Sequence, residues 1–486
     1  MIQPSCEKIE ELAKDYNTIP VCREIYADVV TPITLLRKLK QISQKYYLLE
    51  SIEGGEKWAR YSFLGFDPIL RVTCKDHTVT IEGTETQRIR TDKPLDILRS
   101  LLSKYRAPKL KDLPPFTGGF VGYFAYSMIG YAEPTLKIKQ SSFNDYDLML
   151  FDKVIAYDHL KQKICIVVNV DTAHLMENYG KAVSEIERIR GLIMDHRPLP
   201  SLHSLEKADF NCNVSKDAYC AMVEKTKEHI RNGDIFQAVI SRRFESSYHG
   251  SLVNAYRVLR TTNPSPYMVY MQIDDLEIMS ASPETLVRLQ DGRLSTFPVA
   301  GSRPRGATLQ EDLALEAELL ADEKELSEHN MLVDLARNDL SRISKIPSVK
   351  LMDYMMIHRY SKIMHIASCV ESDIRPDCDA FNAVEAILPA GTLSGAPKIR
   401  ACEIIEELEQ EPRGIYGGAL GYMDFTGNMD ICIAIRMAVK QEGKVYVQAG
   451  GGIVADSVPE LEYAEAGNKA SAVINAILRA SEVDAG

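Results

Sequence analysis

The sequence predicts an α+β fold built on large, mostly antiparallel β-sheets. Short turn signals, such as residues 290–292 (QDG) and 442–443 (EG), join several strand-like runs, and this spacing favours antiparallel hairpins. The long helical segments stand between groups of strands and do not alternate with single strands, which argues against a doubly wound parallel sheet. No fixed repeat and no low-complexity segment interrupts this pattern.

The first part of the chain, residues 1–200, mixes short strands with helices. A glycine-rich aromatic run at 117–126 (TGGFVGYFAY) predicts strands whose backbones approach closely. A helix is predicted over 185–196, and the polar, aperiodic stretch at 195–217 is predicted to be a linker. Other strand-like runs in this part are YYLLES, RVTCKDHTVTIEG and KICIVVNV.

The second part, residues 201–486, begins with a predicted helix over about 215–232 that ends at an Asn-Gly pair. Two longer helices are predicted at about 309–338 and 459–481. Ser457 and Glu460 have the spacing of a capping box at the start of the last helix. Strands are predicted at AVISRRFE, YMVYMQI, TLVRLQDGRLSTF, GGALGYMDF, DICIAIRMAVK and KVYVQAGGGIV.

Composition excludes several classes of protein. A net charge of -11 over 486 residues argues against a nucleic-acid binder, so an anionic ligand would need local cations. The ten cysteines form no CxxC or zinc spacing, which favours reduced thiols and a cytoplasmic protein. The polar, acidic N-terminus is not typical of a signal or transit peptide, and no apolar stretch is long enough to span a membrane.

Two glutamate pairs are the first candidate site. The stretch 322–329 (DEKELSEH) carries one pair at i, i+3, and the last predicted helix carries another, followed by a lysine: Glu325 and Glu328, then Glu462, Glu465 and Lys469. Residues at this spacing share one helix face. Two such pairs could offer oxygen ligands to Mg²⁺, although the same spacing is common on solvated helices.

Three further features could bind an anion. The turn at Gly391 leads into a helix with Pro397 at its start, and helix N-termini attract carboxylates and phosphates. Three glycines at 450–452 expose backbone N–H groups, or form a bulge or tight turn. Arg436, inside an apolar strand, is either paired internally or reaches a ligand. With no nucleophile elbow or dinucleotide fingerprint, the residues point to a Mg²⁺ and dianion site.

The sequence resembles the chorismate-utilising enzymes, most closely the anthranilate synthase component I family. The resemblance runs nearly end to end and is densest from about 230 to 475. Its motifs include GDIFQAVISRRF, NPSPYMVY, SASPETLVR, FPVAGSRPRG, DEKELSEHNMLVDLARND, PAGTLSGAPKIRA, RGIYGGALGY and AGGGIVADSVPELEYAEAGNKA. It implies that both parts of the chain interleave in one large orthogonal β-sandwich with helices packed outside.

The resemblance also implies the roles of the site residues. Glu328 and Glu465 would bind Mg²⁺ directly, and Glu325 and Glu462 would hold its waters. The metal would neutralise the ring carboxylate of chorismate in an acidic protein. The residues expected to grip the substrate are Gly301, Ser302, Thr392, Tyr416, Arg436, Gly450, Gly451, Gly452 and Lys469.

The implied reaction is attack of ammonia on the chorismate ring with loss of the ring hydroxyl, then loss of pyruvate to give anthranilate. Hydroxide leaves poorly, so the reaction needs a general acid. Glu284 matches the family's acid position, and His365 matches a position tied to proton transfer and pyruvate release. Without the resemblance, Glu284 would be taken for a strand-end cap and His365 for a core residue.

Two positions discriminate between family members. Relatives that add water carry a lysine base where this chain has Gln237, and glutamine has no basic site. Relatives that make aminodeoxychorismate commonly carry a lysine where this chain has Ala300. Both differences favour direct attack by ammonia. The alternatives are an aminodeoxychorismate synthase component and a metabolite-binding relative that has lost catalysis.

The resemblance further implies feedback inhibition by L-tryptophan. The amino group would contact Glu50 and Ser51. The remaining residues of this site would be Pro266, Tyr267 and Met268 around the indole, with Leu420 and Tyr422 as the floor. The same residues could equally be a strand end and a proline-rich turn.

The chain shows no amidotransferase-type cysteine elbow. The family obtains ammonia from a separate glutamine amidotransferase subunit, so we expect a heteromeric complex, and specifically a heterotetramer.

Overall fold

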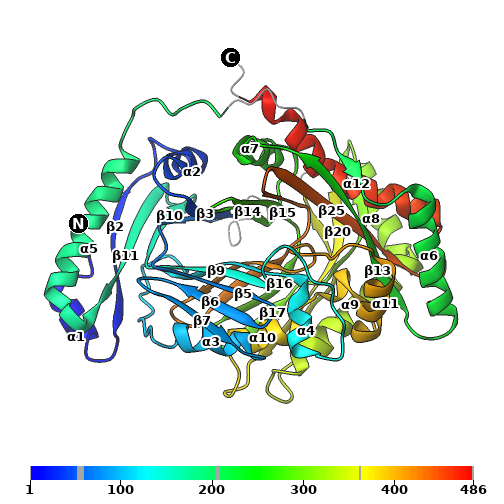
Figure 1. The fold of residues 1–486 in the computed structure, drawn as a ribbon, viewed down its shortest axis with the longest axis horizontal. Coiled ribbons are helices and arrows are strands. Elements are labelled where there is room, and N and C mark those ends of the chain that lie inside the picture. The colour runs from blue at the N-terminus through cyan, green and yellow to red at the C-terminus, as the bar shows by residue number, and fades with distance from the viewer. Residues whose placement is uncertain (1, 52–59, 203–207, 361–362, 484–486) are drawn as a thin grey trace.

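Two antiparallel sheets form the centre of the molecule. The computed structural model describes residues 2–51, 60–202, 208–360 and 363–483. Every strand pair in these ranges that belongs to the two sheets is antiparallel, and most helices lie outside the sheets (Figure 1). The predicted α+β class with mostly antiparallel sheets is therefore confirmed.

The first sheet combines strands from both ends of the chain. Its order is β1 (Ile2–Gln3), β2 (Thr18–Tyr26), β11 (Lys163–Asp171), β10 (Lys153–Asp158), β4 (Tyr61–Phe66), β3 (Lys45–Glu50), β14 (Tyr267–Ile273), β15 (Leu276–Ser282), β24 (Met437–Gln441), β25 (Lys444–Ile453), β13 (Gln237–Ser247) and β12 (Asn211–Cys212), with β21 (Gly395–Ala396) also paired to β13.

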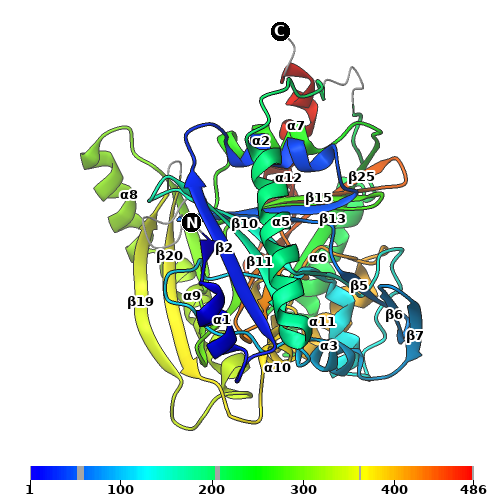
Figure 2. The same ribbon diagram turned by 90° about the vertical axis from the view of Figure 1, so that its left-hand side faces the viewer.

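The second sheet faces the first across the core. Its order is β18 (Val299–Pro304), β20 (Ile363–Asp373), β17 (Arg293–Thr296), β16 (Thr285–Gln290), β23 (Met429–Ile433), β22 (Ala419–Asp424), β8 (Gly119–Phe124), β9 (Tyr146–Phe151), β5 (Leu70–Lys75), β6 (Thr78–Glu82) and β7 (Thr86–Arg90). The additional strand β19 (Lys350–Arg359) pairs with β20 and arches along the outer side of the molecule (Figure 2).

Helices cover the outside of both sheets. In Figure 1, α1 and α5 lie on one flank, α2 and α7 at the top, and α6, α9 and α11 on the other flank. The bounds are α1 (Cys6–Leu12), α2 (Pro32–Lys40), α3 (Pro94–Leu102), α4 (Ile129–Ala132), α5 (Leu175–Ile193), α6 (Lys216–Arg231), α7 (Val253–Thr262), α8 (Leu309–Ala321), α9 (Glu323–Ser341), α10 (Ala380–Ile387), α11 (Lys398–Leu408) and α12 (Pro459–Leu478).

Both parts of the chain contribute to both sheets. In the first sheet β3 pairs with β14, and in the second β8 pairs with β22. Each of these contacts joins a strand before residue 200 to one after it. The resulting apolar cores contain residues from both parts of the chain, as in the cluster that includes Tyr47, Val121 and Val269.

Three helix predictions needed correction. The helix predicted over 185–196 is α5, which begins at Leu175 and ends at Ile193. The helix predicted over 309–338 is two helices, because the backbone of Asp322 is extended and its side chain accepts hydrogen bonds from the N–H groups of Lys324 and Glu325. Asp322 is thus an N-cap that starts α9 directly before the first glutamate pair. The capping box at Ser457 is wrong. The cap of α12 is Val458, and the Ser457 hydroxyl accepts a hydrogen bond from Val454 N–H.

All ten cysteines are free thiols. Within the described residues, no helix combines the length and the apolar character that crossing a bilayer would need.

A buried ion pair joins several elements beside the pocket described below. Arg413 donates to both carboxylate oxygens of Glu409, at 2.7 and 2.8 Å, and to the backbone carbonyls of Leu393 and Val239. Glu409 also accepts from the N–H and hydroxyl of Ser241 in β13. The Arg413 side chain is only 1% exposed. The desolvated guanidinium of Arg413 therefore connects the end of α11, the segment before β21 and strand β13.

Arg413→Met should lower the free energy of unfolding by about 3–5 kcal/mol, because it leaves Glu409 buried without its counter-charge. Urea denaturation followed by circular dichroism measures this loss. The matched control is Arg479→Met, which removes an exposed cation paired with Glu482 and should cost less than about 1 kcal/mol. Equal losses in the two variants would contradict the role given to Arg413.

Candidate functional site

A pocket of about 700 Å³ opens between the sheets and the helices α9 and α12. Fourteen of the fifteen residues predicted for catalysis, substrate and metal line it. These are Glu284, Gly301, Ser302, Glu325, Glu328, His365, Thr392, Tyr416, Arg436, Gly450, Gly452, Glu462, Glu465 and Lys469. They come from segments almost 190 residues apart in sequence (284 to 469), so folding alone brings them together.

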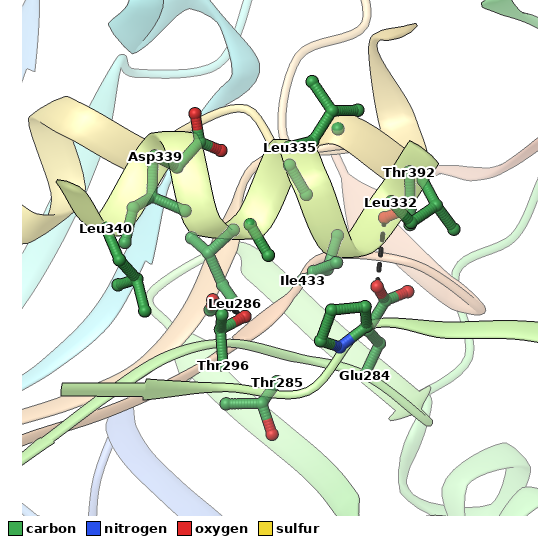
Figure 3. Close-up of a pocket in the computed structure, with 15 residues that line it drawn as sticks. Glu284, Thr285, Leu286, Thr296, Leu332, Leu335, Asp339, Leu340, Thr392 and Ile433 are labelled. Atoms are coloured by element: carbon green, nitrogen blue, oxygen red, sulfur yellow. Dashed lines mark hydrogen bonds between the residues drawn. The ribbon is translucent and has the colours of Figure 1, made fainter. Parts of the chain in front are cut away.

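Glu284 is the most perturbed carboxyl in this pocket. Burial raises its pKa to about 8, against weaker opposing effects of a hydrogen bond from Thr392 and the charge of Arg436. The Thr392 hydroxyl donates to the Glu284 carboxyl at 3.2 Å (Figure 3). Glu284 is therefore protonated at neutral pH and can donate a proton, which is the property that a general acid requires.

A smaller cavity, of about 40 Å³, adjoins Glu284 on the side of α9 and α10. Figure 3 shows Glu284 and Thr392 at one end of this cavity and Asp339 at the other. Glu284, Leu332 and Thr392 line both cavities and so form the partition between them. The other walls of the small cavity are mainly leucine, isoleucine, alanine and proline side chains, which keeps the Glu284 carboxyl in apolar surroundings.

Arg436 is a cation without a partner among the residues that the structure describes. Its side chain is half-buried, and no described residue accepts a hydrogen bond from the guanidinium or forms an ion pair with it. Its backbone has φ = 46°, in the left-handed region that a non-glycine residue adopts at a cost of about 1–2 kcal/mol. Of the two alternatives left by the sequence, an internal pair is wrong, and the guanidinium is available to a carboxylate in the pocket.

His365 has a defined proton arrangement. Its Nδ1 lies 3.0 Å from the Gly301 carbonyl oxygen and 2.9 Å from the Ser302 hydroxyl. A carbonyl only accepts, so we assign the ring proton to Nδ1, which leaves a lone pair on Nε2. Burial lowers the pKa of His365 to about 4, so the ring is neutral at pH 7 and can accept a proton.

The two glutamate pairs face the same pocket from different helices. Burial and the neighbouring charge of Glu328 raise the pKa of Glu325, and burial and Glu465 raise that of Glu462. Lys469 pairs with Glu465 at 2.8 Å. Across the described ranges, no three histidine, cysteine or acidic side chains stand close enough together to hold a metal as they are. The pocket thus holds mutually repelling carboxylates, a donor set that suits a hard divalent cation.

The three glycines lie in a regular strand and not in a turn or bulge. Gly450, Gly451 and Gly452 of β25 pair in register with Ser241, Ile240 and Val239 of β13. A Cβ at Gly450 would lie 2.4 Å from the Ile240 carbonyl, and one at Gly452 would lie 2.2 Å from the Gln237 amide nitrogen. Gly451 does not line the pocket, but a Cβ there would lie 2.9 Å from a Glu462 oxygen. Gly450 and Gly452 therefore let β25 lie close to β13, and Gly451 leaves room for the Glu462 side chain.

Several pocket residues were not predicted, among them Asn263, Lys324 and Gln448. Gln237, singled out in the sequence for its missing base, is almost fully buried. Its amide nitrogen donates to Glu328 at 3.2 Å, and its carbonyl oxygen finds no hydrogen-bond partner in the described part of the chain. A buried carbonyl oxygen without a donor can accept an N–H group from a ligand. Sequence spacing offered no signal for these contacts, because they join distant segments.

A second cavity, of about 530 Å³, lies between β3 and β14 of the first sheet and β16, β22 and β23 of the second. It contains all seven residues predicted for a regulatory site: Glu50, Ser51, Pro266, Tyr267, Met268, Leu420 and Tyr422. Phe63 and Tyr422 pack edge-to-face in its wall, with ring centroids 6.2 Å apart. The cavity is thus mainly aromatic and aliphatic with a few polar groups, which is typical of a small-molecule site.

The carboxylate of Glu50 is already engaged in this structure. It accepts from Arg260 at 2.6 and 3.1 Å and from the Tyr256 hydroxyl at 2.7 Å. The Ser62 hydroxyl donates to Glu50 Oε2 at 3.3 Å. Glu50 therefore anchors helix α7 to β3 at the edge of the cavity. The sequence could not reveal Arg260 as its partner, since 210 residues separate them.

A model of the family described as chorismate binding enzyme matches residues 44–475. Anthranilate synthase component 1 of Acetivibrio thermocellus is 47% identical over 494 residues, covering 99% of this chain and 100% of that protein. The protein of the same name from Aquifex aeolicus is 45% identical over 492 residues and covers 98% of each.

Solved structures similar to this chain include a protein with the same name as these relatives. Anthranilate synthase component I from Streptococcus pneumoniae superimposes with a TM-score of 0.78 at 35% identity, covering 93% of this chain and 99% of that one. The menaquinone-specific isochorismate synthase of Escherichia coli shares the fold, with a TM-score of 0.70 at 20% identity over 97% and 98% of the two chains. The sequence resemblance is thereby confirmed, and the chain belongs to the chorismate binding enzyme family.

Proposed function

We propose that this chain is the aminating subunit of an anthranilate synthase, which converts chorismate and ammonia to anthranilate and pyruvate. Relatives at 40–47% identity carry the name anthranilate synthase component 1. The single observation that carries the proposal is the half-buried, protonated Glu284 in the same pocket as Arg436, a cation with no partner among the described residues. A proton donor and an anion-binding cation are what the departure of hydroxide from a dianionic ring requires.

In the first step ammonia attacks a ring carbon of chorismate through its lone pair. A C–N bond forms, the ring double bonds shift, and the C–O bond of the ring hydroxyl breaks. Glu284 transfers its proton to the departing oxygen, which leaves as water. Thr392, which donates to the Glu284 carboxyl, holds it in place for this transfer. Arg436 and Lys469 supply the cations for the substrate carboxylates.

In the second step the aminated carbon loses its proton, the ring becomes aromatic, and the C–O bond to the enolpyruvyl group breaks. The released enolpyruvate takes up a proton to give pyruvate. Neutral His365, with its Nε2 lone pair, is suited to accept the ring proton, and the Gly301 carbonyl fixes that tautomer.

Mg²⁺ is the cofactor that suits the four glutamates. Glu328 and Glu465 would bind it directly, and Glu325 and Glu462 through waters. The raised pKa values of Glu325 and Glu462 support this assignment, because burial and the neighbouring carboxylates of Glu328 and Glu465 cause them, and a divalent cation would offset both effects. When bound, the ion supplies positive charge that neutralises the ring carboxylate of chorismate.

Ammonia as the nucleophile is favoured by Gln237 and Ala300, both of which line the pocket. Neither can act as a base, and ammonia brings its own lone pair, whereas water would need to be deprotonated. The name component 1 of the relatives implies a second component. We propose that this component is a glutamine amidotransferase that supplies ammonia, in a cytoplasmic heterotetramer.

We also propose that the 530 Å³ cavity binds L-tryptophan as a feedback inhibitor. Its aromatic and aliphatic walls suit an indole ring. Ser51 would contact the amino group, and Glu50, held by Arg260, would contribute negative charge nearby.

The proposal is tested by mixing the chain with chorismate, Mg²⁺ and an ammonium salt and following anthranilate fluorescence. We expect anthranilate to form, and Glu284→Gln to lower kcat by about 10²–10⁴-fold, because the amide cannot donate the acidic proton. Glu177→Gln, which changes an exposed glutamate on α5, is the matched control. Consumption of chorismate without anthranilate would assign the chain to another branch of the family.

The pH dependence of kcat/KM for chorismate tests the state of Glu284. Glu284 acts only while protonated, and burial holds its pKa at about 8. At a fixed concentration of unprotonated ammonia, kcat/KM should be level near neutrality and fall as pH rises through about 8. The residual activity of Glu284→Gln should lack this decrease. A decrease centred near pH 4–5, the ordinary range for glutamate, would contradict the assignment.

Ser51→Leu should raise the tryptophan concentration needed for half-inhibition by at least about tenfold, because a larger apolar side chain displaces the amino group and removes the hydroxyl. The measurement is the rate of anthranilate formation against tryptophan concentration. Ser184→Leu, at an exposed position of α5, serves as control. Unchanged inhibition in Ser51→Leu would remove tryptophan from this cavity.

A further inference from the structure

A hydrogen-bonded bridge crosses the core between the two sheets. Tyr267 begins β14 in the first sheet, and its hydroxyl lies 2.9 Å from the Thr285 hydroxyl and 2.7 Å from a carboxylate oxygen of Asp430. Thr285 and Asp430 belong to β16 and β23 in the second sheet. Tyr267 and Asp430 line the 530 Å³ cavity. Thr285 does not line that cavity; it lines the 40 Å³ cavity beside Glu284.

The direction of these hydrogen bonds can be assigned. Asp430, which pairs with Arg288 at 2.8 Å, is a carboxylate that only accepts, so the Tyr267 hydroxyl donates to it. The Thr285 hydroxyl must then donate to the Tyr267 oxygen. Thr285 is 6% exposed, so its hydroxyl has little access to water as a substitute partner. The bridge is therefore a defined arrangement in which each donor has one acceptor.

Thr285 is the residue next to Glu284. Neighbouring residues in an extended backbone point to opposite faces, and Figure 3 shows the Thr285 and Glu284 side chains on opposite sides of the chain. The pairing of β16 with β23 is irregular between Thr285 and Val287. Such irregularities re-aim the side chains beside them. One short backbone segment thus directs the Thr285 hydroxyl toward Tyr267, which lines the 530 Å³ cavity, and the Glu284 carboxyl toward the 700 Å³ pocket.

We propose that Thr285 is a positioning residue that couples occupancy of the 530 Å³ cavity to the position of Glu284. This inference rests on the tryptophan site proposed above. A ligand that packs against Tyr267 and Asp430 changes the acceptor available to Thr285 and moves the backbone that carries Glu284. Among the described side chains, Thr392 alone hydrogen-bonds to the Glu284 carboxyl, at 3.2 Å, so a displacement of a few tenths of an ångström weakens this contact.

The coupling is tested with Thr285→Val, which keeps the branched shape and removes the hydroxyl. Thr285→Ser is the matched control, because it keeps the hydroxyl. Tryptophan binding is measured by calorimetry on the full chain, with and without chorismate and in the absence of ammonium, and inhibition is measured as anthranilate formation. Coupling between two sites is reciprocal, so chorismate should weaken tryptophan binding in the unaltered chain, by about 5-fold or more.

In Thr285→Val we expect the Kd for tryptophan to change less than about threefold. Chorismate should no longer change that Kd, and tryptophan should no longer inhibit anthranilate formation. Thr285→Ser should retain both. If Thr285→Val proves too unstable to assay, Thr285→Ala removes the same hydroxyl with a smaller side chain, and binding without coupling is again expected.

The outcomes separate the two proposals. If the unaltered chain binds no tryptophan, the function proposed for the cavity fails, and the coupling fails with it. If the unaltered chain is inhibited and Thr285→Val is inhibited to the same degree, the cavity assignment stands and the coupling through Thr285 is overturned.

Discussion

The central constraint on this molecule is the charge balance of one pocket. A chain with net charge -11 must offer positive charge to a ligand that carries two carboxylates. It does so with Arg436, a half-buried guanidinium that no described side chain neutralises. This works only because the nearby Glu284 is kept protonated by burial. An ionised Glu284 would attract Arg436 and remove the positive charge, so the neutrality of the acid and the availability of the cation depend on the same desolvation.

The rest of the architecture maintains that desolvation. Glu284 lies between two cavities, and the apolar walls of the smaller one come from α9, α10 and β16. The Arg413–Glu409 pair fixes the loop and strand that carry Thr392 and Gln237 toward the pocket. Close approach of β25 to β13 needs Gly450 and Gly452, and Gly451 leaves room for the Glu462 side chain. Separate elements thus position Glu284, Arg436 and the two helices that carry the glutamate pairs. These elements meet only in the folded chain.

Much of the fold and site could be predicted from local pattern. The i, i+3 spacing of the glutamates placed each pair on one helix face, and the QDG and EG turns indicated antiparallel strands. Contacts between distant residues could not be predicted in this way. No common sequence pattern links the segments that meet in three such places. These are the pairing of Glu50 with Arg260, the cross-sheet contact of Tyr267 with Thr285, and the burial that shifts the pKa of Glu284. Asp322 was misassigned because its place inside a helical run hid its role as a cap.

The most direct test of this account is the titration of the Glu284 carboxyl itself. Infrared difference spectra between the unaltered chain and Glu284→Gln, collected across a pH series, isolate the C=O stretch of the protonated acid. The account predicts that this band is present at pH 7 and disappears as pH rises through about 8. A carboxyl that is already ionised at pH 6 would contradict it, because Glu284 could then neither donate a proton nor leave Arg436 free for substrate.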